Sequence, residues 1–162
     1  SYCGTIVVDY SKNCHQCNNT IKSISHIEEY EPRGIIKLIE DVIVSLGYDV
    51  GISRRGISKW LIDEGSADIT IAYNEKSGFI VAEATLAYSA TEFETEMYTY
   101  LMKQNYFNKG MCFNLKEDSI ILSLMIYDQH LHFNTCKKLI GNLIKSADRY
   151  DTILINEFGA KG

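Results

Sequence analysis

The apolar residues that follow Pro32, the single proline of the chain, recur at the spacing of an α-helix. Proline is tolerated in the first turn of a helix and glycine is common just after its end, so Pro32 and Gly47 suit the two ends. Positions three and four apart lie on one face of a helix, and this pattern therefore predicts a helix over residues 33–46. Its apolar face is formed by Ile35, Ile36, Leu38, Ile39, Val42, Ile43 and Leu46.

Three segments after this helix have strand character. Residues 57–63 form a short segment that contains Trp60, and residues 67–73 alternate apolar and polar side chains. Residues 79–88 place apolar residues on both faces of a predicted strand. The intervening Asn-Glu-Lys-Ser-Gly of residues 74–78 is typical of a hairpin loop, so the second and third segments are predicted to pair.

A second helix is predicted by the capping-box pattern Thr91-x-x-Glu94, in which each side chain accepts from a backbone N–H at the helix start. An apolar stripe continues this helix to about residue 104. Two further strands, residues 111–115 and 119–127, flank a polar turn at residues 116–118. A last helix carries one apolar face made of Leu139, Ile140, Leu143, Ile144, Ala147 and Tyr150.

The predicted order is α-β-β-β-α-β-β-α, which indicates an α+β fold. Three strands precede the middle helix and two follow it, so a mostly antiparallel sheet with helices on one face is expected. The 162 residues and 46% hydrophobic content fit one packed domain with a short appendage. We expect a cysteine-rich segment at 1–20, a linker at 21–32 and the main domain at 33–162.

The charge and cysteine content narrow the classes of partner and compartment. A net charge of −5 argues against nucleic acid, because binding phosphates requires a basic face. The sequence contains no run of 18 or more apolar residues, so it predicts no membrane-spanning helix. Five cysteines, an odd number that includes a Cys-x-x-Cys pair, favour a reducing compartment, so we expect a cytoplasmic protein.

The element order and the second half of the chain resemble the YbjN-like and type III secretion chaperone-like family. The segment Leu101-Met102-Lys103-Gln104-Asn105 is similar to the family's LL-x-x-N helix end, and the strand, turn, strand and terminal helix follow it. The resemblance implies a homodimer formed largely through the middle helix. It also implies a protein or peptide client held on hydrophobic patches.

The residues expected at the dimer or partner interface are the apolar stripe of the middle helix, Phe93, Met97, Tyr100 and Leu101. Sequence alone leaves open whether this stripe forms the dimer seam or the core of the domain. The chain departs from the chaperones in its cysteine-rich N-terminal extension.

The N-terminal cysteines look like a truncated zinc ribbon. Ribbons use two Cys-x-x-Cys pairs, because four thiolates complete the tetrahedral shell of Zn²⁺. Cys14 and Cys17 form one pair, and Cys3 with Gly4 looks like the second half of the other. We expect the missing ligand one position before Ser1 in the natural chain. The alternatives are three free thiols or a Cys14–Cys17 redox pair.

An enzymatic alternative rests on Asp68 and Glu83, whose surroundings also resemble the PD-(D/E)xK nuclease core. That family uses two acidic residues on adjacent strands to bind Mg²⁺, and a lysine two residues after the second. Here the lysine position is Thr85 and the proline position is Ala67. We therefore favour two ordinary strand residues. No nucleophile-elbow or phosphate-loop pattern occurs, and the sequence predicts a non-catalytic chaperone-like or adaptor domain.

Overall fold

A computed structural model describes residues 32–64, 67–88, 94–108 and 110–161. The chain divides after Pro32, and every helix and strand described below lies in the unit Arg33–Gly162. The predicted zinc ligands Cys3, Cys14 and Cys17, the predicted linker and Phe93 lie outside the described residues.

The structure has the predicted order of helices and strands, with one short helix added. In chain order the elements are α1 (Gly34–Ser45), α2 (Val50–Ser53), β1 (Lys59–Glu64), β2 (Ala67–Asn74), β3 (Phe79–Tyr88), α3 (Glu94–Phe107), β4 (Met111–Lys116), β5 (Ser119–Tyr127) and α4 (Phe133–Phe158). Helix α2 was not predicted, because four residues are too few to show a period. This helix begins where the Asp49 side chain accepts a hydrogen bond of 3.1 Å from the Ile52 amide.

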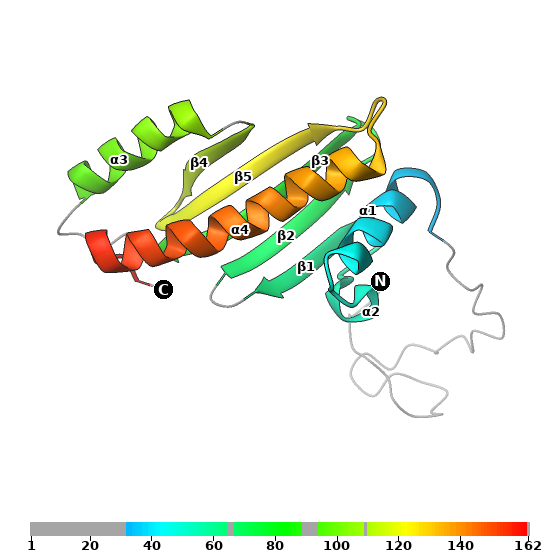
Figure 1. Ribbon diagram of the computed structural model, residues 1–162, viewed down its shortest axis with the longest axis horizontal. Helices are drawn as coiled ribbons and strands as arrows, with labels where there is room; N and C mark the ends of the chain where they lie inside the picture. The colour runs from blue at the N-terminus through cyan, green and yellow to red at the C-terminus, as the bar shows by residue number, and fades with distance from the viewer. Residues whose placement is uncertain (1–31, 65–66, 89–93, 109, 162) are drawn as a thin grey trace, which may run out of the picture. The chain divides into compact units, whose positions relative to one another are not determined.

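The strands form one sheet in the order β1-β2-β3-β5-β4, and each neighbouring pair is antiparallel. The long helix α4 runs across one face and packs against β2, β3 and β5 (Figure 1). Helix α1 packs against α4, and α3 packs against both β4 and α4. The predicted α+β class and antiparallel sheet are confirmed.

One row of paired residues shows how the alternation along each strand builds the core. Ile62, Ile69, Ala84, Leu122 and Phe113 are neighbours on successive strands from β1 to β4, and all five are buried. Paired residues in an antiparallel sheet point to the same face, so this row faces the helices. The residues that alternate with these along each strand therefore point to the opposite face of the sheet.

Helix α4 is 26 residues long, much longer than the apolar segment that predicted it. Its apolar face includes Ile140, Leu143 and Ala147, all fully buried. The small Ala82 and Ala84 of β3 lie in the same core and leave room for a closely packed helix. Within the described residues, no helix has the length and apolar composition needed to cross a membrane.

A buried polar cluster connects α1 to the start of β1. The carboxylate of Glu40 accepts hydrogen bonds from the Arg54 guanidinium and, at 3.1 Å, from Trp60 Nε1. The Glu40 side chain is only 7% exposed, so these partners offset the cost of removing its charge from water. The cluster also orients α2, which lies between Glu40 and Arg54 in sequence.

Candidate protein-binding surfaces

The sheet face opposite α4 exposes a compact group of apolar side chains. Phe79 pairs with Tyr127 and Val81 pairs with Met125, so the four residues occupy adjacent positions on β3 and β5. The Phe79 and Tyr127 rings lie 5.3 Å apart. Met125 is 62% exposed and Tyr127 52% exposed, and no described element covers them. We call these four residues the sheet patch.

The sheet patch is bordered by a polar row at the next positions along the same strands. Thr70, Glu83 and Ser123 are paired across β2, β3 and β5. This row includes one of the two acidic residues considered in the nuclease alternative. Contiguous exposed apolar side chains with a polar rim are typical of protein-binding surfaces.

The structure places Asp68 and Glu83 on adjacent strands and on the same open face of the sheet. Asp68 pairs with Thr85, whereas Glu83 pairs with Thr70, so the two carboxylates are diagonal neighbours. Among the described residues, no group of three or more histidine, cysteine or acidic side chains is arranged to hold a metal ion. The nuclease alternative stays a prediction, and nothing in this geometry favours it.

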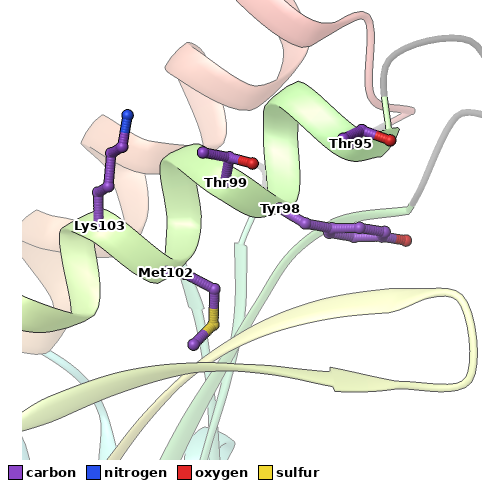
Figure 2. Close-up of a pocket in the computed structure, with 5 residues that line it drawn as sticks. All are labelled: Thr95, Tyr98, Thr99, Met102 and Lys103. Carbon is purple, nitrogen blue, oxygen red and sulfur yellow. The ribbon is translucent and has the colours of Figure 1, made fainter.

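A second apolar surface lies on the outer side of α3. Met102 is 67% exposed, Tyr106 is 87% exposed, and Tyr98 lies one turn before Met102 on the same side of the helix. Figure 2 shows Tyr98 and Met102 projecting from α3 together with the polar Thr95, Thr99 and Lys103. These five residues line an open hollow of about 560 Å³.

The outer surface of α3 continues onto the edge strand β4. A smaller cavity of about 140 Å³ is lined by Tyr98 and Met102 and also by Leu115, which is half exposed. We call Tyr98, Met102, Tyr106 and Leu115 the α3 patch. Three of these residues are spaced at i, i+4 and i+8, so helical periodicity could have identified them.

The α3 residues predicted at the interface are instead directed mainly toward the core of the isolated chain. Met97 is 1% exposed and Leu101 is 4% exposed. Tyr100 is half-buried, and its ring lies 5.2 Å from that of Phe158 on α4. The sequence left core and dimer seam open for this stripe, and the fold assigns Met97 and Leu101 to the core. An interface role for the stripe stays a prediction.

The side chain of Asn105 joins α3 to β4. Its Oδ1 accepts a 2.6 Å hydrogen bond from the amide of Phe113, and its Nδ2 donates at 3.3 Å to the carbonyl of the same residue. Asn105 is the asparagine of the LL-x-x-N pattern in the sequence. Its contacts hold α3 beside the sheet and thereby fix the position of the α3 patch.

No protein-family model matches the sequence, and no curated protein matches it. Solved structures do match the fold. The ExsC–ExsE complex aligns with a TM-score of 0.56 at 14% identity, covering 74% of this chain and 92% of that chain. The type III secretion chaperone SycH of Yersinia pestis, in complex with a stable fragment of YscM2, aligns with a TM-score of 0.55 at 13% identity, covering 72% of this chain and 98% of that chain. The chain has the secretion-chaperone fold.

The secretion-chaperone fold is shared with YbjN from E. coli, which aligns with a TM-score of 0.58 at 9% identity, covering 80% of this chain and 96% of that one. The predicted resemblance to YbjN and the type III secretion chaperones is therefore confirmed at the level of the fold. Because the identities are low, this likeness concerns the arrangement of helices and strands.

Proposed function

We propose that this protein is a non-catalytic binding protein that holds a segment of another protein, in the manner of a chaperone or adaptor. The observation that carries the proposal is the exposed sheet patch of Phe79, Val81, Met125 and Tyr127. Several solved structures with this fold are complexes with another protein, among them the chaperone–effector complex of HopA1 and SchA. The cytoplasmic location expected from the cysteine content is part of the proposal.

The spacing of the sheet patch suits an extended client segment. Along β3, Phe79 and Val81 are two residues apart, and their partners Tyr127 and Met125 are two residues apart on β5. Side chains two apart on a strand lie roughly 7 Å from each other on one face. A client segment with apolar residues at alternate positions would match this spacing and would remove apolar surface of both partners from water.

We also propose that the protein works as a homodimer, with the α3 patch as the contact between the two copies. The hollow and the smaller cavity share Tyr98 and Met102, and Tyr106 follows Met102 by one helical turn. A two-fold dimer uses the same surface on both subunits, so an exposed helix with large apolar side chains can pack against its own copy. Met102 and Tyr106 would be the central contacts.

The four methionines offer a direct test, because each reports on a different part of the domain. Met125 lies in the sheet patch, Met102 in the α3 patch and Met97 in the core. Met111 lines a third cavity, beside the end of α3 and the middle of α4. Peptides selected from a phage-displayed random library on the intact chain would be titrated into protein carrying ¹³C-labelled methionine methyl groups. We expect the selected peptides to shift Met125 and to leave Met97 nearly unchanged.

Two matched variants complete the test. Tyr127→Glu places a charge in the sheet patch and should weaken the selected peptides about tenfold or more, a loss of at least ~1.4 kcal/mol. Ile52→Glu introduces the same charge at a 74% exposed residue of α2 and should leave affinity unchanged. Peptides that bind both variants equally, or that never shift Met125, would show that the sheet patch holds no client.

A further inference from the structure

A third cavity, of about 400 Å³, lies between the end of α3 and the middle of α4. It shares no lining residue with the hollow or the cavity of the α3 patch. Its polar residues include Lys145 and Arg149, one helical turn apart on α4, and Asn108 at the end of α3. We call it the basic pocket.

The two cations of the basic pocket are available to an incoming anion. Both side chains are exposed, and neither forms an ion pair with any residue in the described ranges. They belong to a stripe of Lys138, Asn142, Lys145 and Arg149, spaced so that they share one side of α4. This stripe contains no carboxylate, although the chain as a whole carries a net charge of −5.

Arg149 and Asn108 are positioned by the same buried tyrosine. The Arg149 guanidinium lies 4.4 Å from the centre of the Tyr150 ring, and Tyr150 is 1% exposed. The Tyr150 hydroxyl lies 3.0 Å from Asn108 Oδ1 and 3.1 Å from Gln104 Oε1, so these two oxygens share its single proton. The cation–π contact with a ring held in the core already restricts the guanidinium. Arg149 therefore loses less conformational freedom when a ligand binds.

The amide nitrogen of Asn108 is a buried donor whose partner is not found in the described part of the chain. Leaving such a donor unsatisfied costs about 1–3 kcal/mol, and its burial separates this nitrogen from the pocket as well as from solvent. Lys145 and Arg149 are both hydrogen-bond donors that line the cavity, and neither side chain brings an acceptor. The pocket therefore suits a ligand that brings only acceptors, such as a carboxylate.

We propose that the basic pocket binds an acidic side chain of the partner protein, placed next to an apolar residue. The guanidinium of Arg149 matches a carboxylate in a two-point hydrogen-bonded geometry. Phe107, which is 68% exposed, and the half-buried Met111 line the same pocket and offer contact to the apolar neighbour. Nucleic acid fits less well, because the overall negative charge of the chain repels a long polyanion.

This inference extends the proposed function, on which it rests for the nature of the partner, to a separate surface. It predicts that a client carries an acidic residue outside the part that contacts the sheet patch. The sheet patch would provide apolar contact area, and the basic pocket would select among clients by charge and set their orientation.

The test uses defined peptides and the methyl signal of Met111 in the intact chain. The probe is the acetylated and amidated peptide Gly-Glu-Leu-Glu-Gly, and the control is the same peptide with glutamine in place of glutamate. We expect the glutamate peptide to shift Met111 and to bind about tenfold or more tightly than the glutamine peptide, because charge-assisted hydrogen bonds are roughly twice as strong as neutral ones. Affinity should fall as salt is added.

Matched variants locate the binding site on α4. Lys145→Ala should weaken the glutamate peptide about tenfold, whereas Lys138→Ala, the same change of charge on the same helix face outside the pocket, should have little effect. Arg149→Lys keeps the charge but loses the planar guanidinium with its two parallel N–H donors, and should also weaken binding. Equal losses in Lys138→Ala and Lys145→Ala, or equal binding of both peptides, would overturn the proposal. So would tighter binding of an oligothymidylate with the same number of charges.

The two proposals fail in different ways. If selected peptides never shift Met125 while the glutamate peptide shifts Met111, the sheet-patch function is wrong and the basic pocket remains an anion site. If selected peptides shift Met125 but carry no preference for acidic residues and leave Met111 unchanged, the client function stands and the basic pocket proposal is wrong.

Discussion

The side chain of Asn105 on α3 hydrogen-bonds to both the amide and the carbonyl of Phe113 on β4, at 2.6 and 3.3 Å. Strand β4 is the last strand of the sheet, so it has a neighbouring strand only on the β5 side. The Asn105 amide imitates the backbone of an additional strand at this position. It therefore satisfies polar groups at a sheet edge that would otherwise be free to pair with another chain.

Replacing Asn105 with alanine should destabilise the domain by about 1–3 kcal/mol, because the polar groups of the buried Phe113 backbone lose their partner. Asn105→Asp should keep the bond from the Phe113 amide but lose the one to the Phe113 carbonyl, because a carboxylate has no hydrogen to donate. The measurement is urea-induced unfolding, combined with hydrogen exchange of the Phe113 amide. Lys103→Ala, at an exposed position of the same helix, is the control. An unchanged exchange rate at Phe113 in Asn105→Ala would contradict this role.

Tyr73 should make stability depend on pH in the alkaline range. Its hydroxyl donates a 2.7 Å hydrogen bond to Asp128 Oδ2, and this bond, followed by burial and nearby negative charge, raises the pKa of Tyr73 from 10.0 to about 12. The unfolded chain releases this proton near pH 10 and the folded chain near pH 12. The contribution of Tyr73 is therefore complete below pH 10 and is lost as the pH rises toward 12.

Tyr73→Phe should make the alkaline fall in the free energy of unfolding shallower. Unfolding curves recorded at several pH values between neutrality and pH 12 would measure this slope, and phenolate absorbance would identify the latest-titrating tyrosine. Tyr106→Phe, at an 87% exposed position, should leave the slope unchanged. If Tyr73→Phe and Tyr106→Phe give the same slope, the Asp128 bond does not control this titration.

The turn between β4 and β5 should tolerate, and gain from, a glycine at its first loop position. Lys116 pairs with Ser119, which leaves Glu117 and Asp118 as a two-residue loop, and Glu117 has a φ of 55°. A positive φ is strained for a residue with a Cβ atom, and glycine relieves this strain. Glu117→Gly should raise the free energy of unfolding by about 0.5–1 kcal/mol, measured in urea. Asp118→Gly, where φ is not positive, should instead lower it.

Charged substitutions in the α3 patch should separate the proposed dimer into monomers. One chain has a mass of 18.4 kDa. We expect sedimentation equilibrium of the native protein at micromolar concentration to give twice that mass. Met102→Glu and Leu115→Glu should each give a monomer, because a desolvated carboxylate at the seam has no partner. Ile52→Glu should remain dimeric. A monomeric native protein would contradict the dimer, and a dimer that persists in both patch variants would place the contact elsewhere.

The predicted zinc ligands can be tested with cobalt, which gives thiolate charge-transfer absorption when cysteines coordinate it. We expect this absorption in the intact chain under reducing conditions and its loss in Cys14→Ser, because a ribbon-type site needs thiolate ligands. Cys136→Ser should retain it, since burial raises the pKa of the Cys136 thiol to about 11 and keeps it protonated. Absence of the absorption in the intact chain would indicate that Cys3, Cys14 and Cys17 are free thiols.

Local chemistry in the sequence determined most of the element list. Apolar spacing located α1, and alternation with a loop signal located the hairpin of β2 and β3 almost to the residue. In these elements the spacing of apolar residues and the residues at the ends indicate the same structure. Positions close together in the sequence are therefore sufficient to predict them. The sequence also indicated, through family resemblance, that the elements assemble into the secretion-chaperone fold, and the solved structures bear this out.

Only the tertiary structure decided which apolar residues are buried. Met97 and Met102 lie five positions apart on α3, yet Met97 is 1% exposed and Met102 67% exposed, because α3 packs against β4 and α4 on one side only. The same holds for the basic pocket: Asn108 and Arg149 are distant in sequence and meet because Tyr150 anchors both. Which face is covered depends on contacts between distant segments, and the period of a single element does not contain that information.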